Sequence, residues 1–165
     1  RAAFGQVARE EELVKAFPIL WHQRRSAYLD WRGMVTWGLA GGIGFGITEG
    51  IFYSGSFYNG VESGWVYLVR FLSCVSLHAA WSGTAAIFLA RRADLVEGVE
   101  EWYGWIKPLA VTLGPSILLH ALFDTLLKQH HELLASAVAA GSFVLFLVLY
   151  EGLRRGARTW IPARS

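Results

Sequence analysis

Ionisable side chains interrupt stretches of this sequence that are otherwise apolar. Glu49 lies near the end of a run, Met34 to Tyr53, that contains no other charge. His78 lies in the middle of a second apolar run, and His120 and Asp124 interrupt a third. Near the centre of a membrane a charged side chain costs at least about 2.5 kcal/mol on insertion scales, so each normally faces a partner or a water-filled cavity. Carboxylates and imidazoles gathered around a cavity could activate water or hold a divalent cation.

The spacing of these residues suggests how they cooperate. His120 and Asp124 are four residues apart, so in a helix they share one face, where the carboxylate can orient the imidazole or join it around a ligand. Glu11 and Glu12 precede Lys15 by four and three residues, which allows one ion pair and leaves one carboxylate for other work. Each residue alone could be a hydrogen-bonded packing residue or part of a solvated helix end. The whole set is harder to explain in that way, because four separate segments each contribute ionisable groups.

Long apolar runs must carry these residues. They are Met34 to Tyr53, Trp65 to Ala90, Pro108 to Leu127 and Leu133 to Tyr150. Each approaches the roughly 20 helical residues that cross a hydrocarbon core, and the fourth has no charge and no polar face, unlike most core helices of soluble proteins. The sequence, with 54% hydrophobic residues, therefore predicts an all-α fold: a polytopic transmembrane helical bundle of four full spans.

The opening segment is predicted to be part of an N-terminal helix. It ends in an apolar stretch from Ala16 to Trp21, followed by basic residues, and the first residue is Arg rather than Met. This pattern resembles the second half of a helix. We therefore expect residues 1–165 to be a single transmembrane domain and a fragment that lacks one or more upstream spans.

Basic residues alternate along the chain in a way that predicts topology. The connection before Met34, the loop after Ala90 and the C-terminal tail are basic, whereas Ser54 to Gly64 and Lys128 to Glu132 carry little positive charge. Because Lys and Arg favour the cytoplasmic side, the last two segments are predicted to lie outside. The net charge of +2 is then better explained by this topology in a lipid bilayer than by nucleic-acid binding, and no nucleic-acid partner is expected.

Small residues in the first run predict a close helix contact. Gly38, Gly42 and Gly46 form two overlapping GxxxG patterns. Such a strip lets a neighbouring helix approach closely. We expect it to bring the helix that carries Glu49 against the other polar segments.

Recognisable motifs occur in order: EELVK at Glu11 to Lys15, FGITE at Phe45 to Glu49, His78, and HALFD at His120 to Asp124. This set resembles the PrsW family of intramembrane proteases, described by EExxK, FxxxE, an intervening histidine and HxxxD. That family looks related to the wider group of CAAX prenyl proteases and bacteriocin-processing proteins. Gly50 departs from the family pattern, in which Asn follows the FxxxE glutamate.

The resemblance implies hydrolysis of a peptide bond within or beside the membrane. The implied partner is a membrane-anchored protein substrate, of which an anti-sigma factor is the best-known example in the family. The implied location is a bacterial or archaeal cell membrane. Carried over position by position, the candidate catalytic residues are Glu11, Glu12, Lys15, Glu49, His78, His120 and Asp124.

Two mechanisms remain open. In one, His78 and His120, with Glu49 or Asp124, hold zinc or another divalent metal, and Glu12 takes a proton from the water. In the other, Glu12 activates water directly, assisted by its neighbouring glutamate, and the two histidines stabilise the oxyanion. The chain lacks a compact HExxH motif that would decide between them.

A second function class uses the same residues without catalysis. The protein would then be a proton-coupled carrier, or a membrane binding or structural protein in which polar residues hold helices together. Carriers often contain two related halves with broken helices, and this sequence shows no such repeat. The endopeptidase is therefore the preferred interpretation.

Overall fold

The computed structural model describes residues 9–18, 20, 30–56, 64–92, 95, 99 and 101–158. Within these ranges the regular elements are helices, and residues 9–18 form an N-terminal helical segment. The others are α2 Trp31–Ser56, α3 Gly64–Arg91, the short 3-10 helix η2 Trp102–Trp105, α4 Ile106–Lys128 and α5 Glu132–Arg158. The prediction of an all-α fold is confirmed for this part of the chain.

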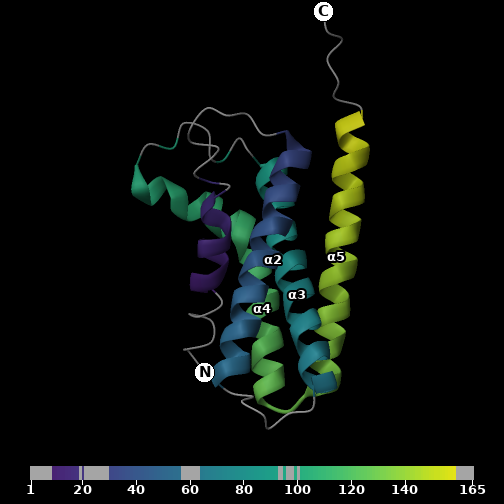
Figure 1. Ribbon diagram of the computed structural model, residues 1–165. Helices are drawn as coiled ribbons and strands as arrows, with labels where there is room; N and C mark the ends of the chain where they lie inside the picture. The colour runs from purple at the N-terminus through teal and green to yellow at the C-terminus, as the bar shows by residue number, and fades with distance from the viewer. Residues whose placement is uncertain are drawn as a thin grey trace, which may run out of the picture.

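The four long helices form an up-and-down bundle around α3. Consecutive long helices run in opposite directions, and the N-terminal segment and α5 lie at opposite sides of the bundle (Figure 1). Helix α3 contacts α2, α4 and α5. Residues on α3 can therefore meet partners from every other long helix.

Three helices are long and apolar enough to cross a membrane: Phe71–Arg91, Tyr103–Lys128 and Glu132–Gly156. Helix α2 has 26 residues but is not among them, and its many glycines lower its mean hydropathy. Four full spans therefore remain a prediction. Most of the predicted outer loop at Ser54 to Gly64, and most of the basic connection before α2, lie outside the described residues.

The glycine strip of α2 packs directly against α3. A Cβ atom added at Gly42 would lie within 3.0 Å of the His78 carbonyl oxygen, and one added at Gly46 would lie 2.7 Å from the Val75 Cα. Real Cβ atoms essentially never come so close to a neighbouring backbone. The predicted close approach is confirmed, and it sets the α2 backbone against the turn of α3 that carries His78.

Two glycine substitutions test this contact. Gly42→Ala should lower the free energy of unfolding in mixed micelles by about 1–3 kcal/mol, because the added methyl group overpacks the α2–α3 contact. Gly44→Ala is the matched control, since a Cβ there meets nothing within 4 Å. It should be neutral or add up to about 1 kcal/mol through helix propensity. Equal effects of the two substitutions would contradict the close packing.

Candidate active site

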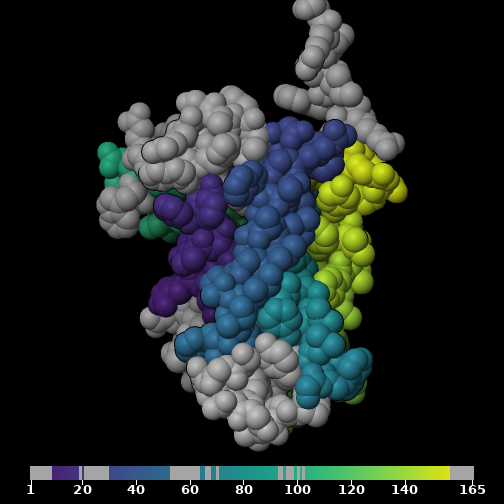
Figure 2. Space-filling view, viewed as in Figure 1, coloured from purple at the N-terminus to yellow at the C-terminus, as the bar shows by residue number. Residues whose placement is uncertain are grey.

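The N-terminal segment contributes a buried ion pair to the interior of the bundle. It lies beside α2 on the face shown in Figure 2. The Glu12 side chain is 1% exposed, and its Oε1 accepts a hydrogen bond from Lys15 Nζ at 2.6 Å. The three-residue spacing places both groups on one helical face. Burial of such a pair is tolerated only when each charge is compensated, and here each compensates the other.

Lys15 connects this pair to His78 and Glu49. Its Nζ lies 2.6 Å from His78 Nδ1 and 4.5 Å from the centre of the Phe45 ring. An ammonium group only donates, so Nδ1 accepts and the His78 proton is assigned to Nε2. That nitrogen faces Glu49 Oε2 at 2.5 Å. A continuous polar chain thus joins the N-terminal segment, α3 and α2.

His120, on α4, has one engaged nitrogen and one that is less tightly held. Its Nδ1 lies 3.1 Å from Glu12 Oε1. Its Nε2 is 3.5 Å from Glu11 Oε2 and 3.5 Å from Asp124 Oδ2, distances that are long for a hydrogen bond. The four-residue spacing therefore does bring Asp124 beside His120, but without a short bond between them.

Glu11 presents a carboxylate oxygen that is available to a ligand. Its Oε2 is buried and has no hydrogen-bond partner among the described residues, although Lys15 Nζ lies 3.9 Å away. Leaving such an atom unsatisfied costs about 1–3 kcal/mol or more, so it calls for an explanation such as an ion. Ligand atoms of Glu11, His78 and His120 all lie within 4.8 Å of one another.

This donor set fits a divalent metal. Two imidazoles and one carboxylate are the ligands of many catalytic zinc sites, which keep a fourth position for water. A second group, Glu49, Cys74 and His78, also has its ligand atoms within 4.8 Å, and it shares His78 with the first. Both groups come from the described residues, and Asp124 belongs to neither.

Aromatic packing surrounds the histidines. Trp81 is 2% exposed and stacks on His120, with ring centroids 4.4 Å apart and an interplanar angle of 19°. The His78 ring stands at 90° to Trp81 and at 84° to His120, with centroid distances of 5.6 and 5.1 Å. The orientations of the two imidazoles are thus defined by one another and by the indole.

Trp81 and Cys74 also belong to this region, although neither was predicted from the sequence. Trp81 follows His78 by three residues and Cys74 precedes it by four, so helical periodicity places both on the face of α3 that carries the histidine. That spacing was the available signal. The spacing alone does not distinguish these two residues from packing residues, because tryptophan and cysteine are common in apolar helices.

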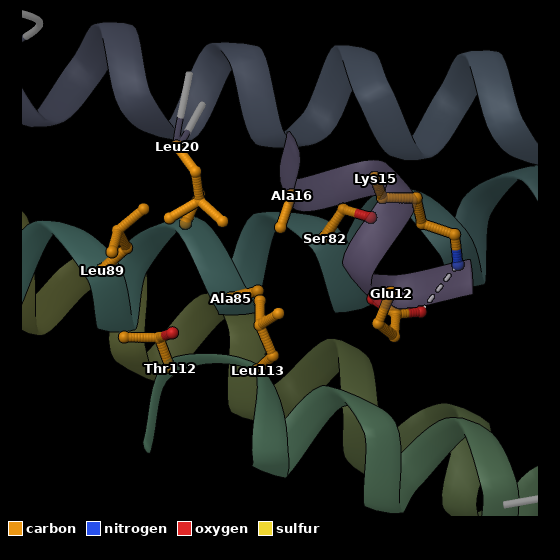
Figure 3. Close-up of a pocket in the computed structure, with 10 residues that line it drawn as sticks. Glu12, Lys15, Ala16, Leu20, Ser82, Ala85, Leu89, Thr112 and Leu113 are labelled. Carbon is orange, nitrogen blue, oxygen red and sulfur yellow. Dashed lines mark hydrogen bonds and ion pairs between the residues drawn. The ribbon is translucent and has the colours of Figure 1, made fainter. Parts of the chain in front are cut away.

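A small cavity adjoins the ion pair (Figure 3). It has a volume of about 10 Å³, and its polar walls are Glu12, Lys15, Ser82 and Thr112. A cavity of this size holds roughly one water molecule. The Ser82 hydroxyl has no hydrogen-bond partner among the described residues, and the two histidines do not line the cavity. Water there could contact the Glu12 side chain.

The structure joins all the predicted site residues by contacts, but it groups them differently from the expected metal set. The expected set combined the two histidines with Glu49 or Asp124. The geometry instead places Glu11 with both histidines, and Glu49 with His78 and Cys74. The role of each residue stays a prediction.

Comparison with known proteins agrees with the motifs. The chain matches a family described as PrsW family intramembrane metalloprotease over residues 1–151. No match was found among curated proteins or among solved structures. The matched range includes every residue of the polar network, and the resemblance inferred from the motifs is confirmed.

The buried ion pair makes a prediction about stability. Lys15→Met should lower the free energy of unfolding by about 3–5 kcal/mol, because it leaves the Glu12 carboxylate buried without its cation. The double variant Glu12→Gln, Lys15→Met should recover part of that loss, since the buried Glu12 charge is then removed as well. Lys107→Met, at an exposed position, is the control. A Lys15→Met loss no larger than the control's would argue against the pair.

Proposed function

The chain belongs to the PrsW family of intramembrane metalloproteases, and on that premise we propose that it cleaves a membrane-anchored protein at the polar network between its helices. The convergence of Glu11, His78 and His120 within 4.8 Å carries this proposal. These residues come from the N-terminal segment, α3 and α4. A peptidase that works in a membrane needs such a site, where water and a polarising group are both available.

The metal version of the mechanism is favoured by the donor set. Glu11, His78 and His120 would hold a divalent ion such as zinc, with the unpartnered Glu11 oxygen as one ligand. A bound zinc polarises a carbonyl group and lowers the pKa of a water molecule towards neutrality. For His78 to act as a ligand, one of its contacts, to Lys15 or Glu49, has to open.

Glu12 is better suited to orient His120 than to act as the base. Its carboxylate is almost fully buried, and Oε1 is engaged by both Lys15 and His120 Nδ1. A carboxylate at the far nitrogen of an imidazole fixes the tautomer and leaves Nε2 directed at the ligand. Lys15 in turn compensates the charge of the Glu12 carboxylate.

Asp124 is the proposed proton acceptor. Its side chain is 30% exposed, and Oδ2 lies 3.5 Å from His120 Nε2, so it is near the candidate ligand group without belonging to it. A carboxylate at this position can take a proton from water and return it to the leaving amine. Glu49 would hold the Nε2 proton of His78 until that ring reorients.

The proposed substrate is a protein anchored by a membrane span, similar to an anti-sigma factor, in a bacterial or archaeal membrane. The family match and the three candidate spans support this proposal. The peptide bond would reach the site at the ends of α2 and α4 that carry Glu49 and Asp124, whose side chains are more exposed than those of the two histidines.

Cleavage of a single-span substrate by site variants tests these roles. Asp124→Asn and His120→Ala should each lower kcat by about 10²–10⁴-fold, as expected for loss of proton transfer or of a ligand. Glu12→Gln should cost only roughly 10- to 100-fold, because the amide oxygen still accepts from His120. His131→Ala, at an exposed position before α5, is the matched control. Full activity of Asp124→Asn would remove it from the mechanism.

Removal of divalent cations separates the two mechanisms. Treatment of the purified protein with a strong chelator should abolish cleavage, and added zinc should restore it. If Glu11 is a ligand, the Glu11→Gln variant should bind little metal, so added zinc should not restore its cleavage activity. Cleavage that persists after complete chelation would support direct activation of water by the glutamates.

A further inference from the structure

The indole of Trp81 is fixed from α5, a helix that contributes no motif residue. Trp81 Nε1 donates a hydrogen bond to Ser142 Oγ at 3.0 Å. The Ser142 hydroxyl in turn donates to the Val138 carbonyl oxygen of its own helix at 2.8 Å. Ser142 is 1% exposed, so water does not replace these bonds. A buried indole N–H needs an acceptor, and within the described residues Ser142 provides it.

Helix α4 holds the backbone of Trp81 through a separate hydrogen bond. Ser116, which is fully buried, donates from Oγ to the Trp81 carbonyl oxygen at 2.8 Å. Ser116 lies four residues before His120, so both reach α3 from one face of α4. Ser116 thus fixes the axial position of α4 relative to α3, and the Trp81 indole fixes the plane of the His120 ring.

We infer that Trp81 is a positioning residue for His120 and that Ser142 positions Trp81. This inference rests on the proposed function. The nearly parallel stack at 4.4 Å restricts rotation of the imidazole about its own bond. That restriction keeps Nδ1 at Glu12 while Nε2 faces Glu11 and Asp124. If the indole turned away from Ser142, the stack with His120 would open. The His120 ring could then rotate, and Nδ1 and Nε2 would no longer face Glu12 and Glu11.

The same arrangement gives α5 a role in the site. Its outward face is apolar, with exposed Leu133, Val144 and Leu147, whereas Ser142 is a buried polar residue on its inward face. A helix needed only to fill space would not require a hydroxyl at that position. The hydrogen bond that Trp81 Nε1 donates to Ser142 Oγ therefore makes the orientation of His120 on α4 depend on the position of α5.

The test compares Ser142→Ala with Ser136→Ala, the same change at an exposed position of α5. Ser142→Ala should lower kcat and the affinity for zinc each by about 10- to 100-fold with little change in KM, as for other groups that orient ligands. Zinc affinity is measured by competition with a chelating dye on folded protein. Ser136→Ala should match the parent in both measurements.

A double-variant cycle with Trp81→Phe assigns the effect to the indole. Phenylalanine keeps an aromatic ring but has no N–H to donate, so Ser142→Ala should cost nothing further in that background. An equal loss in both backgrounds, or parental kcat and zinc affinity for Ser142→Ala, would overturn the inference. His120→Ala is assayed in parallel. If this variant keeps its activity, the proposed active site is refuted. If it is inactive while Ser142→Ala behaves like the parent, only the role of Ser142 is refuted.

Discussion

A lysine ammonium and a glutamate carboxylate, both nearly excluded from solvent, face each other at 2.6 Å in the N-terminal segment. Neither charge could be buried alone, because an uncompensated ion in a low-dielectric interior costs several kcal/mol. Each then reaches a histidine on another helix: Lys15 contacts His78 of α3, and Glu12 contacts His120 of α4. One ion pair thereby joins three elements and holds the two imidazole rings 5.1 Å apart.

This arrangement depends on how closely the backbones approach. The glycines of α2 remove the side chains that would separate it from α3, and Gly42 lies against the carbonyl group of His78 itself. Glu49, about two turns beyond Gly42 along α2, can then contact the His78 ring. The cost of polar groups in an apolar bundle is offset because each finds a charged or hydrogen-bonding partner from a neighbouring helix. Among the described residues the buried Glu11 Oε2 and the Ser82 hydroxyl lack such a partner, and of these two atoms the Glu11 oxygen is the one whose charge suits a cation.

Aromatic and hydroxyl groups outside the motifs give the polar network its orientation. Trp81 provides a flat surface for His120, while Ser116 and Ser142 hold its backbone and its indole. A metal site depends on such outer contacts, since a ligand that can rotate binds weakly. The match to the PrsW family covers these residues as well as the motifs.

The sequence by itself determined the helical class, three spans long enough for a membrane and the close α2–α3 contact, because hydropathy and GxxxG spacing are local properties. Its short motifs also predicted the candidate site residues. It did not determine which carboxylate meets which imidazole. Helical spacing pairs Glu12 with Lys15, but only the rotation of that segment against α3 and α4 brings Glu12 to His120 and leaves a buried Glu11 oxygen without a hydrogen-bond partner. The contacts of Trp81 with His120 and Ser142 were likewise decided by tertiary structure, because they join residues far apart in the chain through the packing of whole helices.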